Sequence, residues 1–450
     1  MAIPDKYKDM CSFYKYYSGE KVAPVLTIFI GGNHEASNYL QELPYGGWVA
    51  PNIYYLGYAS VIFIAGVRIA GISGIYKSHD WMQGHHETVP YNNSTIRSVY
   101  HIRNLEVFRL NQISGNVDIF LSHDWPRGIT QYGDEQALLR MKPFFKDDIE
   151  ANALGSPPCM DLLLRHCPTY WFSAHLHCKF AALVPKEEGS PKVTKFLALD
   201  KCLPKRKFLQ ILEIPHDEKS PIRISYDLEW LTILYLTNHL LSVKSGTHYM
   251  PGKGGDARSD YTPTEAEKES VSKKFGNDLE IPANFAQTSK PYNPDSPRGP
   301  IEPARLSVNP QTTSFCDKLG IDDPSALLQI MTNTKDNSLN NSAADRSTDS
   351  RNASFTFDDD NVMSSTLDED SPDDSSYRTS PLGVAPEIFT IDSSMTEKSD
   401  EQTMDDKEVD DRITELTTTE ETAVSKDGET IGPNCKKFKR RNHSFYNDTT

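Results

Sequence analysis

The sequence predicts an α+β domain over residues 1–245, followed by a disordered acidic tail over residues 246–450. Charge and aromatic content support this division. Residues 1–250 hold 25 Lys and Arg against 24 Asp and Glu, whereas residues 251–450 hold 22 against 39. All five tryptophans and 12 of the 13 histidines also lie in the first part. A segment with high net charge and few large apolar side chains cannot bury a core, so we expect the tail to be disordered.

Helical and strand-like patterns alternate along the predicted domain. The first helix is expected at residues 5–18, because Met10, Phe13 and Tyr17 recur at helical spacing before Gly19. A buried strand follows at 23–30, and two strands at 53–64 and 67–72 are joined by a tight turn at Ala65-Gly66. Helical spacing predicts further helices at 98–112, 136–140, 159–166 and 227–241. Short apolar or alternating runs predict strands at 117–121, 169–173, 180–184, 194–200 and 208–214.

Several classes of protein are disfavoured. The longest apolar runs, such as residues 62–65, are far shorter than the ~20 residues of a membrane span. The first six residues lack the basic and then apolar pattern of a secretory signal. Seven cysteines without a CxxC pair argue against a disulfide framework and favour a reducing compartment.

Three predicted strands end in the same way, with an apolar run that stops at a histidine-bearing polar turn. The turns are Asn33-His34-Glu35, His123-Asp124 and His175-Leu176-His177. Ligands gather at the carboxyl ends of strands in such folds. Imidazole suits Zn, Fe and Mn, and an amide oxygen suits harder ions. Each histidine alone is more often an ordinary polar residue, but the three turns together predict a divalent metal site.

The order of these motifs resembles the calcineurin-like metallophosphoesterases and, within them, the lariat debranching family. The resemblance rests on Gly-Gly-Asn-His-Glu at 31–35, Ser-His-Asp-Trp-Pro at 122–126 and Ser-Ala-His-Leu-His at 173–177, and covers roughly residues 5–240. It implies a metallophosphoesterase-type β-sandwich flanked by helices. It also implies a metal-dependent hydrolase that opens the 2′–5′ phosphodiester at the branchpoint of excised intron lariat RNA.

The resemblance also implies roles for single residues. Asn33, His123 and His175 would bind one divalent metal, Fe²⁺, Zn²⁺ or Mn²⁺, and His177 would bind a second. His34 would be the general acid that protonates the leaving 2′-oxygen, and Glu35 would orient it. The nucleophile would be a water whose pKa is lowered by metal.

Residues 73–103 form a long polar and aromatic stretch, which in this family resembles the loop that recognises the branch. Unstacked RNA bases stack on aromatic rings and guanidinium planes, and cations bind phosphates. An ordinary polar insertion is the alternative, although loops of this length are usually functional. The predicted substrate-binding residues are Tyr76, Lys77, His79, Trp81, His85, Tyr91, Arg97, Tyr100 and Arg103.

One part of the family pattern has no counterpart in the sequence. The family begins with a β-α-β unit whose Asp/Cys-x-His and Gly-Asp motifs bind metal, and here only 22 residues precede Ala23. We therefore expect the first β-α-β unit to be missing, the second metal site to be incomplete, and activity to be weak or absent. A non-catalytic protein that binds branched RNA, or a phosphoesterase with another substrate, are the alternatives.

The tail carries one basic cluster, with five cations among residues 436–441 (Lys436, Lys437, Lys439, Arg440 and Arg441). Such a cluster is typical of a nuclear localisation signal. We expect a nuclear protein that binds an import receptor through these side chains, unless the cluster only balances its acidic neighbours.

Overall fold

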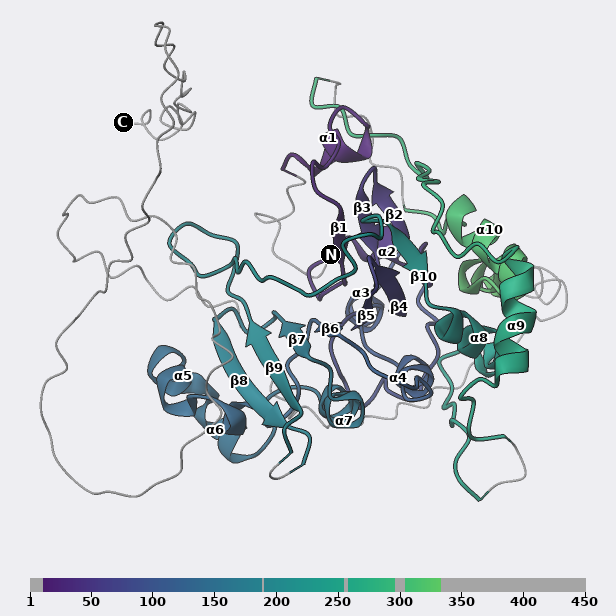
Figure 1. The fold of residues 1–450 in the computed structure, drawn as a ribbon. Helices are drawn as coiled ribbons and strands as arrows, with labels where there is room; N and C mark the ends of the chain where they lie inside the picture. The colour runs from purple at the N-terminus through teal and green to yellow at the C-terminus, as the bar shows by residue number, and fades with distance from the viewer. Residues whose placement is uncertain (1–10, 188–189, 255–257, 296–303, 333–450) are drawn as a thin grey trace, which may run out of the picture. The chain divides into compact units, whose positions relative to one another are not determined.

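The computed structural model describes residues 11–187, 190–254, 258–295 and 304–332 (Figure 1). The described strands form two sheets. The smaller sheet has the order β1-β3-β2, with β1 (Thr27–Phe29) parallel to β3 (Ile53–Tyr55) and β2 (Gly47–Ala50) antiparallel to it. The larger sheet has the order β10-β4-β5-β6-β7-β9-β8.

The centre of the larger sheet is parallel and its borders are antiparallel. Strands β5 (Val67–Ile72), β6 (Ile119–Ser122), β7 (Tyr170–Ser173) and β9 (Val193–Ala198) run in one direction. Strands β4 (Ala59–Ile64), β8 (Phe180–Pro185) and β10 (Ile224–Tyr226) run against their neighbours. The carboxyl ends of β5, β6 and β7 therefore meet at one edge.

The described α-helices are α1 (Phe13–Tyr17), α2 (Ser37–Leu40), α3 (Thr95–Ser98), α4 (Asn104–Leu110), α5 (Glu135–Met141), α6 (Lys146–Glu150), α7 (Pro157–His166), α8 (Leu228–Leu236), α9 (Glu265–Lys274) and α10 (Pro310–Leu319). Residues 324–332 are also helical. The 3-10 helices within the described residues are η2 (Ile129–Tyr132), η3 (Pro143–Phe145) and η4 (Asn238–Leu240). No helix in the described ranges is both long enough and apolar enough to cross a membrane.

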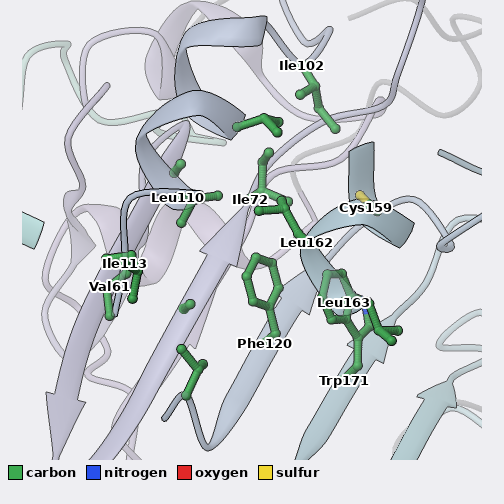
Figure 2. Close-up of a cluster of buried hydrophobic side chains, with 14 of the residues drawn as sticks. Val61, Ile72, Ile102, Leu110, Ile113, Phe120, Cys159, Leu162, Leu163 and Trp171 are labelled. Carbon is green, nitrogen blue, oxygen red and sulfur yellow. The ribbon is translucent and has the colours of Figure 1, made fainter. Parts of the chain in front are cut away.

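The larger sheet buries one face along its whole width, and its other face where β4, β5 and β10 lie. On one face, Phe120 and Trp171 stack with ring centroids 4.1 Å apart and pack under α4 and α7 (Figure 2). On the other face, a second cluster that includes Ile62 and Ile69 packs against residues of the smaller sheet, among them Tyr54. The alternation of Val61 and Ile62 between the two clusters follows from the two-residue period of a strand. This arrangement confirms the predicted α+β sandwich with flanking helices.

The tight turn between β4 and β5 confirms the strongest local prediction. Ala65 and Gly66 both have positive φ, 49° and 80°. Two such residues in succession match the twist of the flanking strands in a two-residue hairpin. The hairpin fixes the register of β5, whose carboxyl end leads to the loop at 73–103.

Residues 208–214 do not form the predicted strand. The structure gives this segment no regular element, and the side chains of Leu209 and Ile211 are 69% and 70% exposed. The prediction of a strand here is wrong, because among the described residues no strand pairs with the segment. A strand needs a partner for its backbone groups.

The predicted boundary at residue 245 is too early. Helices α9 and α10 lie beyond it, and Val271, Phe275, Cys316 and Leu319 are buried in the same core cluster as Phe120. Polar contacts tie this segment to the preceding part of the chain, because Gln311 accepts from the Trp48 backbone N–H at 2.8 Å and donates to its carbonyl at 2.9 Å. Residues 333–450 of the predicted tail, which include 436–441, lie outside the described residues.

Candidate metal and RNA-binding site

The carboxyl ends of β1, β5, β6 and β7 are joined by hydrogen bonds. Gly74, just after β5, donates to the carbonyl of Gly31 at 2.8 Å, and Gly31 donates to the hydroxyl of Ser73 at 3.0 Å. Ala174, just after β7, donates to the carbonyl of His123 at 3.2 Å. The three histidine-bearing turns that the sequence indicates are therefore neighbours in space.

Two serines, the last residues of β6 and β7, hold the ends of these strands together. The hydroxyls of Ser122 and Ser173 are 2.9 Å apart, and both lie within hydrogen-bond reach of the Asp124 carbonyl. The indole N–H of Trp171 donates to Ser122 at 2.9 Å. Because these groups are buried and satisfied, they fix the direction in which the chain leaves both strands.

The three predicted ligands of the first metal lie together. The Oδ1 atom of Asn33 is 3.0 Å from Nε2 of His123, and the rings of His123 and His175 are 4.9 Å apart between centroids. His175 and His177 both have positive φ, 55° and 53°. This unusual backbone curls the chain after β7 and changes the directions of the two rings.

The electrostatics of the histidines favour neutral imidazoles. Burial lowers the pKa of His123 well below its ordinary value, and His175, His34 and His177 nearby lower it further. Burial, followed by the charge of Lys201, lowers the pKa of His177 to about 4. Neutral imidazole is the form that binds metal, so this donor set fits a divalent cation.

Gly32 provides the space in which His123 sits. A Cβ at this position would lie 2.6 Å from Cε1 and 2.9 Å from Nε2 of the His123 ring. Gly32 therefore allows the backbone before Asn33 to approach the imidazole closely. The residues present fit a metal held by Asn33, His123 and His175.

The predicted catalytic residues flank this group. His34 is exposed, and its charge acts on His123 and His177. Glu35 accepts a hydrogen bond from the backbone N–H of Gly32 at 3.3 Å, and burial raises the pKa of its carboxyl. The described contact of Glu35 thus braces the loop that carries Asn33 and His34.

Most of the predicted substrate-binding residues of the 73–103 loop are accessible. His79 and Arg97 are exposed, and Tyr76, Lys77, Trp81, Tyr91 and Tyr100 are half-buried. The rings of Tyr76 and Trp81 pack edge to face at 5.6 Å. The backbone of Tyr76 is anchored to the carboxylate of Asp124, which accepts its N–H at 3.2 Å. The aromatic start of the loop is therefore fixed beside the metal-site turn.

For His85 and Arg103 the prediction of RNA contact is corrected. His85 stacks on Tyr58 at 3.8 Å between centroids and bonds Glu106 at 3.2 Å. The Arg103 side chain is 1% exposed and donates to Glu87 at 2.6 Å. A buried carboxylate needs a partner, so the Arg103 guanidinium pairs with Glu87 and the His85 ring hydrogen-bonds Glu106. Neither side chain faces solvent.

Sequence reasoning missed one site residue, Asp124. Its side chain is buried, one carboxylate oxygen lies 3.9 Å from Nε2 of His175, and burial raises its pKa. At this distance the carboxylate is not hydrogen-bonded to the imidazole, but it lies beside a predicted metal ligand. Its position directly after His123 at a strand end was the available signal.

Two known families match the chain. The calcineurin-like phosphoesterase family matches residues 2–179, and the C-terminal domain of lariat debranching enzymes matches residues 191–324. The second match agrees with the folded segment beyond residue 245.

Curated relatives point to the same group. The lariat debranching enzyme of Drosophila melanogaster is 56% identical over 375 residues, which cover 73% of this chain and 70% of that protein. The enzyme of Arabidopsis thaliana is 51% identical, over 71% of this chain and 74% of that protein. The enzyme of Homo sapiens is 57% identical, and the chain spans 61% of its length.

Proposed function

The chain belongs to the lariat debranching enzyme family of calcineurin-like metallophosphoesterases, and from this premise we propose that it hydrolyses the 2′–5′ phosphodiester at the branchpoint of excised intron lariat RNA. The observation that carries the proposal is the meeting of Asn33, His123 and His175, with Asn33 Oδ1 and His123 Nε2 3.0 Å apart. Intron turnover during mRNA processing is the corresponding cellular role.

The residues of the chain divide the chemistry among them. Asn33, His123 and His175 would hold one divalent ion, and His177 would contribute to a second. An ion bound there supplies a Lewis acid that lowers the pKa of a water molecule and offsets phosphate charge. His34, exposed at the rim, donates a proton to the leaving 2′-oxygen. Glu35 holds the backbone of this turn through Gly32.

The accessible part of the 73–103 loop binds the branch in this proposal. Tyr76, Trp81, Tyr91 and Tyr100 present aromatic faces for unstacked bases. Lys77 and Arg97 provide positive charge for the phosphates. Asp124 accepts the backbone N–H of Tyr76 and lies 3.9 Å from Nε2 of His175. The start of the loop is therefore held beside the metal-binding turn.

The decisive experiment is cleavage of a synthetic branched RNA compared with a linear RNA of the same sequence. The sequence pattern alone favours weak or absent activity, but family membership leads us to expect metal-dependent cleavage of the branched RNA only. His123→Ala should reduce this cleavage at least ~100-fold, because the metal loses a ligand. His216→Ala is the matched control, since His216 is exposed and outside the site. If the chain binds branched RNA equally well with and without metal and never cleaves it, it is instead a non-catalytic binding protein.

Fe²⁺, Zn²⁺ and Mn²⁺ are the proposed metals, because the donors are imidazole nitrogens and one amide oxygen. To distinguish them, metal-free chain is reloaded with each ion in turn, with oxygen excluded for Fe²⁺, and the cleavage rates are compared.

A nuclear location is proposed from the sequence alone, through the basic side chains of Lys436, Lys437, Lys439, Arg440 and Arg441. Replacing these five by alanine in a fluorescent fusion should abolish nuclear accumulation.

A further inference from the structure

The 73–103 loop contains a second convergence of metal-binding atoms, outside the group at Asn33, His123 and His175. His79, Asp80 and His101 each direct one potential ligand atom to a common point, with all three atoms within 4.8 Å of one another. The Oδ2 atom of Asp80 lies 3.2 Å from Nε2 of His79 and 2.6 Å from Nδ1 of His101. We propose that these three side chains form a site for one borderline divalent cation such as Zn²⁺.

The spacing suits a metal of this class. Zn–N and Zn–O bonds of about 2.0–2.2 Å place neighbouring ligands of a tetrahedral ion about 3.3–3.5 Å apart. The His79–Asp80 separation of 3.2 Å is already close to this value. The His101–Asp80 separation is that of a hydrogen bond, so cation binding replaces the shared proton and lengthens this contact.

Two of the three ligands are held in place before any cation binds. The backbone of His101 pairs with Ile75 in an isolated parallel bridge, and the Asp80 carbonyl accepts from the guanidinium of Arg103 at 3.1 Å. The side chains of Asp80 and His101 are 8% and 6% exposed. Preorganised ligands cost little ordering on binding, which favours affinity.

The third ligand opens the site to solvent. The side chain of His79 is 70% exposed. The buried hydrogen bond between Asp80 and His101 is complete without His79. The approach of the His79 imidazole to the same carboxylate oxygen is therefore not needed for that bond. Three protein ligands with one solvent-facing side leave a coordination position for water, as in open zinc sites.

The local charge favours a cation. The guanidinium of Arg103 lies 3.8 Å from Oδ2 of Asp80, which alone would oppose metal binding. However, Arg103 also binds Glu87 at 2.6 Å. With two carboxylates against one guanidinium, the cluster carries one net negative charge, which a divalent ion compensates.

The test titrates Zn²⁺ into a chain whose other site is disabled by His123→Ala and His175→Ala, followed by calorimetry and by the absorption of bound Co²⁺. We expect one equivalent to bind, and His79→Ala to weaken this binding at least ~10-fold. His216→Ala, also an exposed histidine, should leave it unchanged. Neither readout depends on RNA cleavage.

Folding is monitored in parallel, because Zn²⁺ should raise the melting temperature of the disabled chain and not that of its His79→Ala form. If the His123→Ala, His175→Ala chain does not fold, the comparison is made in the chain without these two substitutions. There His79→Ala should lower the number of bound Zn²⁺ ions by one. Equal Zn²⁺ binding with and without His79, or no equivalent assignable to the loop, would overturn the proposal.

Discussion

At the scale of single residues, the candidate site depends on the lack of a side chain at Gly32 as much as on the metal ligands. Its φ is not in the left-handed region, so the glycine is not required by backbone conformation. It is required by space, because three atoms of the His123 ring lie within 2.9 Å of a hypothetical Cβ. The imidazole therefore occupies the volume that a side chain at residue 32 would take.

We expect Gly32→Ala to lower both metal affinity and the cleavage rate at least ~10-fold, because the His123 ring must shift away from Asn33. Gly31→Ala is the matched control, since its Cβ would meet the end of the flexible Leu40 side chain at 3.1 Å. Metal titration and cleavage assays on both variants check this. If Gly32→Ala behaves like Gly31→Ala, the ring does not need this space.

At the scale of elements, helix α7 packs on the strands of the larger sheet that lead to the site. Ser156 caps its N-terminus by accepting from Cys159, and Cys167 ends it in a left-handed conformation. His166 in its last turn is buried, and its Nε2 donates to the carbonyl of Leu110 at the end of α4. Burial, followed by the charge of Arg165, lowers the pKa of His166 to about 4.

This shift predicts acid destabilisation. The unfolded chain takes up the proton near pH 6.5 and the folded chain only near pH 4, so the stabilisation is complete above pH 6.5 and declines as the pH falls toward 4. Relative to His166→Gln, the wild-type chain should lose about 1.4 kcal/mol of unfolding free energy per pH unit, about 3 kcal/mol in total. Urea unfolding across this range measures the difference. His216→Gln retains His166 and should keep the wild-type slope. A slope for His166→Gln equal to that of the wild-type chain would contradict the assignment.

At the scale of the whole described chain, the segment beyond residue 245 completes the core. Leu319 of α10 is fully buried, and Glu42 accepts hydrogen bonds from Thr288 and Asn309, more than 240 residues away in the sequence. Helix α9 begins with a capping box between Thr264 and Glu267. These contacts make the segment part of the domain that supports the site.

We expect Leu319→Ala to lower the unfolding free energy by about 2–5 kcal/mol, because it leaves a cavity in a shared core. Leu209→Ala, at a side chain that is 69% exposed, should change it by less than about 0.5 kcal/mol. Urea unfolding by tryptophan fluorescence reports on this, since all five tryptophans precede residue 245. A small effect of Leu319→Ala would show that the segment folds independently.

The sequence by itself determined the features that depend on local pattern. The Ala65-Gly66 turn, most strands of the parallel centre and helix α7 follow from periodicity and turn residues. The turns after β6 and β7 were also identifiable, because neighbouring parallel strands bring their carboxyl ends to one edge of a sheet. Asn33 follows β1 of the smaller sheet, so only the packing of the two sheets brings it to His123.

Only the tertiary structure decided which polar residues face solvent and where the domain ends. His85 and Arg103 look like RNA contacts in the sequence, yet inside the domain His85 hydrogen-bonds Glu106 and Arg103 pairs with Glu87. Helix α9 is mostly polar and buries only Val271, so composition averaged over a window conceals its packing face. Burial and ion pairing are set by partners far away in the chain, and such partners exist only once the fold has formed.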